Sequence, residues 1–182
     1  MALHYLLGDA TDPILKPALL PHVCNSGNGW GRGYVLALSA KWPEPEKEYH
    51  NWFATGKPQL GDVQFVQVKP DISVANIIGQ EGTHWKGGVP PIRYAALTKG
   101  LTAVFQKAKQ ENLTVHAPRL GAKLAGGDWS TIEKILLGTM TVETYIYTLP
   151  KERNEWPGTV YDNDVAPYVT PTTDIDLSSV FK

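Results

Sequence analysis

The sequence contains little cysteine, little net charge and no long hydrophobic run. Cys24 is the only cysteine in 182 residues, so a disulfide within the chain is excluded, and a metal site would depend on histidines and carboxylates. The formal net charge of −1 gives no indication of a large basic surface for double-stranded nucleic acid, although a local basic patch stays open. No segment approaches the roughly 20 apolar residues of a membrane-spanning helix.

The N-terminus also lacks the pattern of a signal peptide, because its apolar run is short and has no basic flank. We therefore expect a soluble, cytoplasmic protein. The histidines lack the spacing of metal ligands, so we expect no metal and no cofactor. Cys24 lies in an apolar stretch, which favours an inert buried side chain over a nucleophile.

Composition divides the chain into two parts. Hydrophobic residues make up 42% of the chain and charged residues 19%, which is typical of a globular protein that buries a sizeable core. From Pro150 onward prolines recur and aliphatic residues become few. We predict one domain over residues 1–150 and a C-terminal extension over residues 151–182 that wraps the surface or is partly disordered.

Strand and helix patterns alternate along the predicted domain. Short apolar or β-branched segments predict strands at residues 3–7, 21–25, 63–68, 73–78, 113–117 and 142–149. Apolar residues at helical spacing and helix-start signals predict helices at residues 34–42, 45–55, 92–111 and 130–137. The alternation predicts an α/β fold, with a mixed, largely parallel sheet covered by helices on both faces. In such folds ligands bind at the carboxyl ends of the strands.

The stretch from His22 to Gly33 connects a predicted strand to a predicted helix. Glycines occupy alternate positions in it, at 27, 29, 31 and 33. Glycine loses much conformational entropy on folding, so this cluster indicates a requirement of the backbone. A loop whose N–H groups converge on an anion, in front of a helix N-terminus, meets that requirement. Asn25 and Asn28 add amide donors and acceptors, and the alternative is a glycine-rich surface turn.

Two further segments and one turn carry polar groups near predicted strand ends. Residues 118–129 form a second glycine-containing connection from strand to helix, followed by a capping-box pattern at residues 130–133. Residues 79–88 form a third glycine-rich segment, which carries Glu81 and His84. Asp9 follows the first strand and a glycine, where its carboxylate can reach over the sheet edge or cap a turn.

Taken together, these motifs resemble the macro domain family, whose members bind ADP-ribose on a three-layer α/β/α fold. The resemblance covers about residues 3–149. Its pieces, in order, are Gly8-Asp9, His22-Val-Cys-Asn25, Trp30-Gly-Arg-Gly33 with Trp42-Pro43, Pro118-Arg-Leu-Gly121 through Asp128-Trp129, and Tyr147-Thr-Leu149. The similarity is nearest to the branch of the yeast-type ADP-ribose 1''-phosphate phosphatases and the small glutamate-ADP-ribose hydrolases.

The resemblance implies that a diphosphate lies between two loops. Asp9 would accept a hydrogen bond from the adenine amino group, and Asn25 would contact the distal ribose. Tyr147 would pack near the adenine or the proximal ribose, or would lie in the core. The implied ligand-binding residues are Asp9, Ala10, Asn25, Asn28, Gly29, Gly31, Arg32, Gly33, Leu120, Gly121, Ala122, Lys123, Leu124, Ala125 and Tyr147.

Two residues depart from the family pattern. Arg32 stands where the family usually has a small residue, and Lys123 where it often has glycine. One hypothesis is that they form a pair of cations for an extra phosphate on the distal ribose. The alternative is that both side chains point to solvent.

The candidate catalytic residues are His22, Asn25 and Asp128. His22 matches a histidine implicated in the yeast-type phosphatases, where an imidazole could act as nucleophile or general acid/base. The alternative for His22 is a core histidine bonded to the backbone. Asp128 could act as a base or orient water, and helix capping beside Ser130 is the competing interpretation.

The glutamate-ADP-ribose hydrolases use, by the same resemblance, a lysine and a second-loop aspartate. This chain has Ile78-Gly79-Gln80-Glu81 in the lysine region and Ala125 at the aspartate position, which makes a lysine adduct doubtful. We favour a phosphatase of ADP-ribose 1''-phosphate. The alternatives are an ADP-ribosyl hydrolase of protein, nucleic acid or small adducts, and a binding module without catalysis. The expected partners are ADP-ribose, its 1''-phosphate or ADP-ribosylated macromolecules, and neither a membrane nor a structural nucleic acid.

Overall fold

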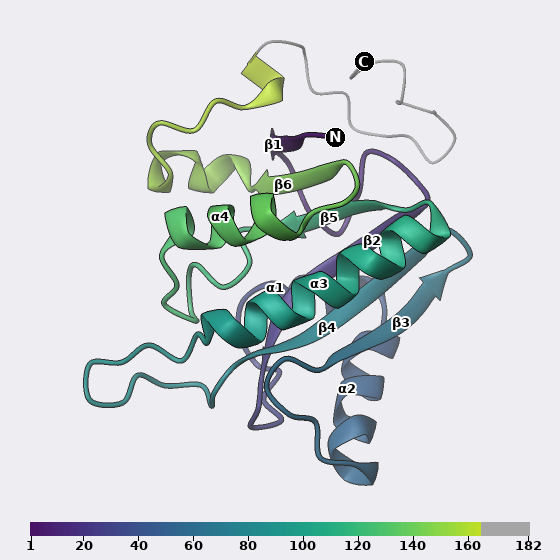
Figure 1. The fold of residues 1–182 in the computed structure, drawn as a ribbon, viewed down its shortest axis with the longest axis vertical. Coiled ribbons are helices and arrows are strands. Elements are labelled where there is room, and N and C mark those ends of the chain that lie inside the picture. The colour runs from purple at the N-terminus through teal and green to yellow at the C-terminus, as the bar shows by residue number, and fades with distance from the viewer. Residues whose placement is uncertain (165–182) are drawn as a thin grey trace.

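A six-stranded sheet forms the centre of the structure, a computed structural model that describes residues 1–164 (Figure 1). In spatial order the strands are β1 (Leu3–Leu7), β6 (Thr144–Thr148), β5 (Thr114–Pro118), β2 (Ala18–Asn25), β4 (Ile72–Gln80) and β3 (Val63–Lys69). Each neighbouring pair is parallel except β3 and β4, which are antiparallel. The prediction of a mixed, largely parallel sheet is confirmed.

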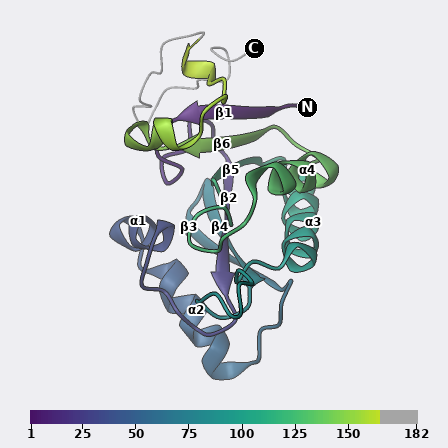
Figure 2. The same cartoon turned by 90° about the vertical axis from the view of Figure 1, so that its left-hand side faces the viewer.

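Helices cover both faces of the sheet, which confirms the three-layer α/β/α fold (Figure 2). One layer holds α1 (Tyr34–Lys41) and α2 (Glu44–Thr55), and the other holds α3 (Tyr94–Glu111) and α4 (Trp129–Thr139). The periodicity of α3 explains its place, because its apolar stripe is buried against the sheet. That stripe comprises Leu97, Leu101, Val104, Phe105 and Ala108.

The central strand β2 contributes to the core on both faces. Leu19 lies in the cluster beneath α3 and α4, whereas Leu20 and Cys24 lie in the cluster beneath α1 and α2. Successive side chains of a strand point to opposite faces, so a strand covered on both sides is apolar throughout. Cys24 is buried, and burial raises the pKa of its thiol, as expected for an inert core cysteine.

Residues 150–164, here named the C-terminal segment, run along the β1 edge of the sheet (Figure 1). They contain two short 3-10 helices, η1 (Pro150–Glu155) and η2 (Asp162–Asp164). The Asn163 side chain accepts a hydrogen bond from the Leu7 N–H, and Tyr161 is 1% exposed. The remainder of the predicted extension, residues 165–182, lies outside the described residues.

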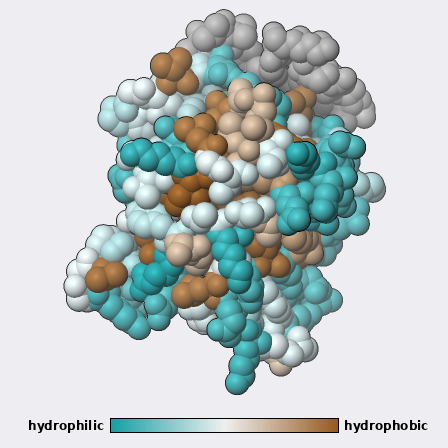
Figure 3. All heavy atoms as spheres, in the orientation of Figure 1, coloured by the Kyte–Doolittle hydropathy of each residue, from teal (hydrophilic) through white to brown (hydrophobic). Residues whose placement is uncertain are grey.

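The molecular surface on the side of α3 and α4 carries a mixture of hydrophobic and hydrophilic residues (Figure 3). Figure 3 shows hydrophobic and hydrophilic atoms interspersed over the side that carries α3 and α4. Within residues 1–164, none of the helices is long and apolar enough to cross a membrane.

Candidate functional site

Two loops stand at the carboxyl ends of the neighbouring strands β2 and β5. Loop 1 (residues 26–33) leads from β2 into α1, and loop 2 (residues 119–128) leads from β5 into α4. Paired positions of β2 and β5 occur only at the amino ends of the strands, at Ala18 and Leu19 of β2. The loops that follow the two strands lie at the edge where α/β sheets bind ligands, and the space between them is here named the crevice.

The two loops touch each other across this crevice. A Cβ built on Gly33, the last residue of loop 1, would lie 3.1 Å from Leu124 Cδ1 of loop 2. Gly33 has φ of 81°, a conformation that L side chains rarely adopt. Gly33 therefore meets two requirements at once, a left-handed backbone and close approach of the opposite loop.

Loop 1 owes its shape to Asn25. Its Oδ1 accepts hydrogen bonds from the N–H groups of Gly27 at 2.9 Å and Gly29 at 3.0 Å, and its Nδ2 donates to the Gly29 carbonyl at 2.9 Å. The Tyr49 hydroxyl donates to the Asn25 carbonyl at 2.7 Å. Asn28, with φ of 62°, pairs through Oδ1 with His50 Nδ1 at 2.6 Å. The amide of Asn25 thus shapes the loop, and its contact with a ribose stays a prediction.

Loop 2 closes on its own backbone. The Gly127 N–H donates to the Gly121 carbonyl at 2.8 Å, and Gly121 has φ of 77°. Leu120 and Ala125 are buried, so these two predicted ligand residues can offer only backbone groups. Leu124 is 52% exposed at the crevice. The loop therefore presents main-chain atoms together with the Leu124 side chain.

A third segment, residues 81–89, lies against both loops and projects from the sheet between β4 and α3 (Figure 1). The Gly82 N–H donates to Ser26 Oγ of loop 1 at 3.1 Å. On the other side, a Cβ on Gly126 of loop 2 would lie 2.7 Å from Trp85 Cζ2. Trp85 is 58% exposed, and Glu81 pairs with Arg93 at 3.0 Å. This segment forms one wall of the crevice, which the sequence indicated only as a glycine-rich loop.

Asp9 lies in the turn after β1. Its Oδ1 accepts hydrogen bonds from both the N–H and the hydroxyl of Thr11 at 2.8 Å. The Tyr34 hydroxyl is buried, and burial together with the nearby Asp9 carboxylate raises its pKa. Ala10 is buried beside Asp9, at 4% exposure. Asp9 therefore caps its own turn through one carboxylate oxygen and has a second oxygen that Thr11 does not use.

Tyr147 lies in the core, one of the two alternatives for this residue. It is 3% exposed, and its hydroxyl accepts a hydrogen bond from the Ile14 N–H at 3.0 Å. The same hydroxyl lies 2.8 Å from Nδ1 of His116, a buried residue of β5. His116 has a pKa lowered to about 3, because burial disfavours its charged form and the charge of His4 adds to the effect.

His22 lies in the core beneath loop 1. Its Nε2 is 2.6 Å from Asn76 Oδ1, and its ring packs edge-on against Trp30. The Asn76 Nδ2 donates to other groups, so Oδ1 is the acceptor and His22 Nε2 carries the hydrogen. Burial lowers the pKa of His22 to about 4, so its imidazole is neutral at neutral pH.

Asp128 caps α4. Its Oδ2 accepts hydrogen bonds from Ser130 Oγ at 2.8 Å and from the Thr131 N–H at 3.0 Å. These bonds from Ser130 and Thr131 lower the pKa of Asp128, so the carboxylate is ionised and acts as the helix cap that the competing interpretation described.

The two cations of loops 1 and 2 differ in their surroundings. The Lys123 ammonium lies 2.7 Å from Glu152 and 3.2 Å from Glu155 of η1. Partial burial lowers the pKa of Lys123, but these two carboxylates outweigh burial and raise it overall. Arg32 is exposed and has no ion pair with another residue of the described chain. Glu152 and Glu155 thus already balance the charge of Lys123. The hypothesis that Lys123 and Arg32 form a pair of cations for an extra phosphate did not include these two carboxylates.

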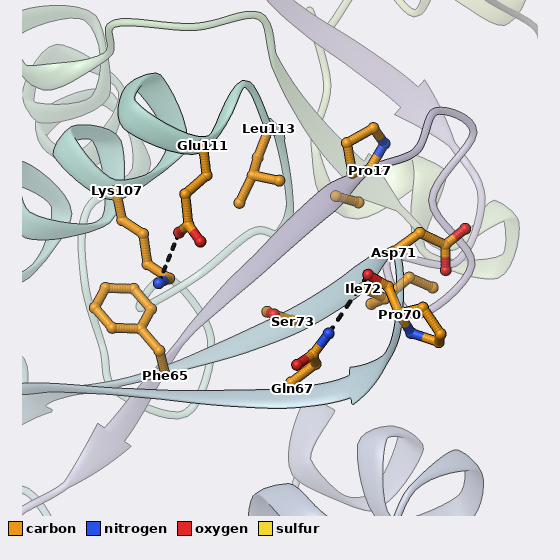
Figure 4. Close-up of a pocket in the computed structure, with 11 residues that line it drawn as sticks. Pro17, Phe65, Gln67, Pro70, Asp71, Ile72, Ser73, Lys107, Glu111 and Leu113 are labelled. Atoms are coloured by element: carbon orange, nitrogen blue, oxygen red, sulfur yellow. Dashed lines mark hydrogen bonds and ion pairs between the residues drawn. The ribbon is translucent and has the colours of Figure 1, made fainter.

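A separate pocket of about 220 Å³ lies at the opposite edge of the sheet (Figure 4). It is lined by the amino ends of β2 and β4 and by the end of α3. Lys107 lies over the Phe65 ring and pairs with Glu111 at 2.7 Å, so these charges satisfy each other. Residues 1–164 also contain no group of three or more histidine, cysteine, aspartate or glutamate side chains placed to hold a metal ion. The crevice between the loops is the better candidate site.

Solved structures place the chain in a family. A macrodomain protein from Streptomyces coelicolor is 40% identical, with a TM-score of 0.71, and the match covers 81% of this chain and 99% of that one. The chain belongs to the macro domain family. A Bacteroides thetaiotaomicron protein of unknown function is also 40% identical, with a TM-score of 0.79 and coverage of 82% and 99%. The macro domain of this chain also shares its fold with Thermosipho africanus DarTG in complex with ADP-ribose, at 18% identity, a TM-score of 0.65 and coverage of 84% and 42%.

Curated relatives are more distant or much longer than this macro domain. The mouse chromodomain-helicase-DNA-binding protein 1-like is 30% identical over 167 residues, which are 84% of this chain and 18% of that protein. The chain thus spans less than a fifth of the length of this relative. The ADP-ribose 1''-phosphate phosphatase of Lodderomyces elongisporus is 23% identical over 159 residues, 82% of this chain and 99% of that protein. No protein-family model matches the chain.

Proposed function

We propose that this macro domain binds ADP-ribose with the diphosphate between loop 1 and loop 2. The contact between Gly33 and Leu124 carries the proposal, because it brings the starts of α1 and α4 to one crevice. Helix starts and loop N–H groups stabilise phosphate without lysine side chains. The complex of Thermosipho africanus DarTG with ADP-ribose supports this choice of ligand.

The adenine amino group is assigned to the Asp9 carboxylate. Thr11 uses only Oδ1 of Asp9, which leaves Oδ2 to accept a hydrogen bond from the ligand. The distal ribose then lies toward the far end of the crevice, beside residues 81–89. This orientation would put the 1'' position of the ligand near the most exposed wall of the site.

Calorimetry with Asp9→Asn tests the binding proposal. The asparagine keeps one carbonyl oxygen for the turn but can present an amide donor to the adenine amino group, so we expect at least a tenfold loss of affinity for ADP-ribose. Ribose 5-phosphate, which lacks adenine, serves as the control ligand and is expected to bind both forms equally. Absence of binding by the unsubstituted protein at millimolar ADP-ribose would contradict the proposal.

For catalysis we propose release of the 1''-phosphate from ADP-ribose 1''-phosphate. The Lodderomyces elongisporus phosphatase, which this chain matches over 99% of its length, supports this activity. Water would attack phosphorus, the bond from phosphorus to the ribose oxygen would break, and the products would be ADP-ribose and inorganic phosphate. Loop N–H groups would stabilise the charge on the phosphoryl oxygens.

His22 gives the sharpest test of that activity. A nucleophilic or acid/base role requires the imidazole to reach the phosphate, whereas a supporting role requires only its bond to Asn76. If His22 is catalytic, His22→Asn abolishes phosphate release and leaves ADP-ribose affinity within twofold. If His22 supports loop 1, both quantities fall together. Phosphate release and calorimetry on the same variant distinguish these outcomes.

The burial of His22 favours a second candidate, an ADP-ribosyl hydrolase that does not use this imidazole. The bond between the distal ribose and its attached group would then be hydrolysed: the hydroxyl and the proton of water would end on the two separated parts, and ADP-ribose and the unmodified group would be released. Incubation with a protein that carries ADP-ribose on glutamate, followed by mass spectrometry, tests this activity. Loss of the ADP-ribosyl mass without phosphate release from the 1''-phosphate would favour this candidate.

A further inference from the structure

Arg119 opens loop 2, and aromatic rings surround its guanidinium. The guanidinium carbon lies 4.6 Å from the Trp156 ring centroid, 4.8 Å from that of Tyr5 and 4.9 Å from that of Trp129. Arg119 is 7% exposed. Guanidinium groups stack well on aromatic faces, and such contacts strengthen when they are removed from water. The start of loop 2 is therefore buried beneath Trp156 of the C-terminal segment.

Hydrogen bonds also fix the orientation of the Arg119 guanidinium. Arg119 Nε donates to Thr148 Oγ1 at 3.1 Å, at the end of β6. Its Nη2 donates to Thr159 Oγ1 at 2.9 Å and to the Tyr161 hydroxyl at 3.4 Å, both in the C-terminal segment. Planar donors on one guanidinium fix its orientation more tightly than a lysine ammonium would.

The C-terminal segment also contacts the middle and the far end of loop 2. Lys123, in the middle, pairs with Glu152 and Glu155. Trp129 begins α4 directly after loop 2, and its ring lies 6.3 Å from that of Trp156, edge to face. Loop 2 is thus attached to residues 150–164 at its start, its middle and its end.

We infer that Arg119 is a positioning residue, which holds loop 2 in its binding conformation by anchoring it to the C-terminal segment. Ordering a free loop costs conformational entropy at every residue, and a loop that is ordered before the ligand arrives avoids this loss on binding. The expected effect of this anchoring on ligand affinity rests on the proposed binding of ADP-ribose. The expected effect on the mobility of loop 2 does not depend on any ligand.

Trp156→Ala in the full 182-residue chain tests the inference. Removal of this ring exposes one face of the Arg119 guanidinium and frees Trp129 on one side. We expect hydrogen exchange of the amides in residues 119–128 to become at least tenfold faster without ligand, while the amides of residues 26–33 change less than twofold. We also expect ADP-ribose affinity to fall about tenfold, measured by calorimetry.

Two further variants make the test specific. Trp52→Ala removes the same half-buried side chain from α2 on the opposite face of the sheet, and we expect exchange in loop 2 to stay unchanged. Thr159→Val removes one acceptor of Arg119 without removing a ring, so it serves where Trp156→Ala does not fold, with an expected exchange increase of about threefold.

The outcomes separate this inference from the proposed function. The positioning role is supported if Trp156→Ala speeds exchange in loop 2 but not in loop 1, and if Trp52→Ala leaves exchange in loop 2 unchanged. This support does not require that ADP-ribose binds. Unchanged exchange in loop 2 of a folded Trp156→Ala or Thr159→Val protein would overturn it, even if ADP-ribose does bind. Equal acceleration in both loops would overturn it as well, since that result indicates a general loss of stability.

Discussion

Loop 1 and loop 2 face the same crevice but are held in different ways. Loop 1 is shaped from within, because Asn25 at its base bonds to the backbone of Gly27 and Gly29. Loop 2 is held from outside, by Trp156 over Arg119 and by glutamates on Lys123. The bonds of Asn25 join residues two to four positions apart, whereas the hydrogen bonds between loop 2 and the C-terminal segment join residues 29 to 42 positions apart.

The difference shows why one half of the site is easier to recognise than the other. A loop that is stabilised locally has its partners in its own motif, as in His22-Val-Cys-Asn25 and the glycines that follow. A loop that is stabilised remotely has partners whose spacing in sequence carries no regular pattern. Substitutions that affect one kind of support without the other can test this contrast.

Low pH is expected to have the largest effect on stability, because it acts on buried histidines in the strands that lead into both loops. The pKa of His22 in β2 is lowered to about 4 and that of His116 in β5 to about 3, mainly by burial. Their contribution to the free energy of unfolding is complete above the unfolded pKa of about 6.5. As pH falls from 6.5 toward 4, the unfolded chain takes up protons that the folded protein does not, so stability falls by roughly 1.4 kcal/mol per pH unit for each histidine.

Urea unfolding at pH 7, 5.5 and 4.5 measures this dependence. His116→Gln is expected to reduce the slope to about half, since one of the two neutral histidines is removed. A stability that stays constant between pH 7 and 4.5 would show that neither imidazole is held neutral in the folded protein.

Asn25→Ala is expected to have the next largest effect and to act on loop 1 alone. It removes the three hydrogen bonds between the buried Asn25 amide and the loop backbone, each worth about 1 kcal/mol, so the free energy of unfolding should fall by about 3 kcal/mol. The longer bond from the Tyr49 hydroxyl to Oδ1 is also lost, while that hydroxyl keeps its bond to the Asn25 carbonyl. Denaturant unfolding gives the total, and hydrogen exchange localises it to residues 26–33. If residues 119–128 also exchange faster by the same factor, the two loops do not have independent supports.

Gly127→Ala is expected to disturb loop 2 from within. A Cβ on Gly127 would lie 2.5 Å from the Gly121 carbonyl oxygen, a backbone atom that cannot move without opening the loop. Overpacking of this kind destabilises by about 2 kcal/mol. Gly31→Ala is the matched control, since a Cβ there has no neighbour within 4 Å, and it should change thermal stability little.

Lys123→Gln is expected to have the smallest effect on stability. Its ion pairs with Glu152 and Glu155 lie near the surface and are partly exposed, so their loss should lower stability by about 0.5 kcal/mol at low salt and less at high salt. Thermal unfolding at 0.02 M and 0.5 M salt checks this dependence. Arg32, the cation of loop 1, replaced by glutamine, gives a control without an ion pair in the described chain.

Much of the fold could be predicted from the sequence because its signals are local. Every predicted strand and helix is present, with differences of a few residues at the ends, such as β2 beginning at Ala18 rather than at residue 21. The apolar stripe of α3 predicted which face is buried, and alternation of strands and helices predicted the layers. These features depend on residues three or four apart or on neighbours in a strand.

The supports of the site could not be predicted, because they join residues far apart in the chain. The contact of Trp156 with Arg119 and the bond from His116 to Tyr147 connect different elements. Asn25 appeared as a group for the ligand, but its hydrogen bonds to the loop only become visible once the turn is formed. The catalytic roles of His22, Asn25 and Asp128 stay predictions, now with defined hydrogen-bond partners against which they can be tested.

The position of β6 between β1 and β5 has a consequence for synthesis of the protein. A ribosome makes β1 first, yet this strand pairs with β6 alone among the strands of the described chain, so it stays without a partner until Thr144–Thr148 has emerged. The turn that bears Asp9 and the anchors of loop 2 are therefore completed by the last described portion of the chain. A nascent chain that ends before β6 already contains every glycine of the two loops, but it lacks the strand that pairs with β1 and the segment that anchors loop 2.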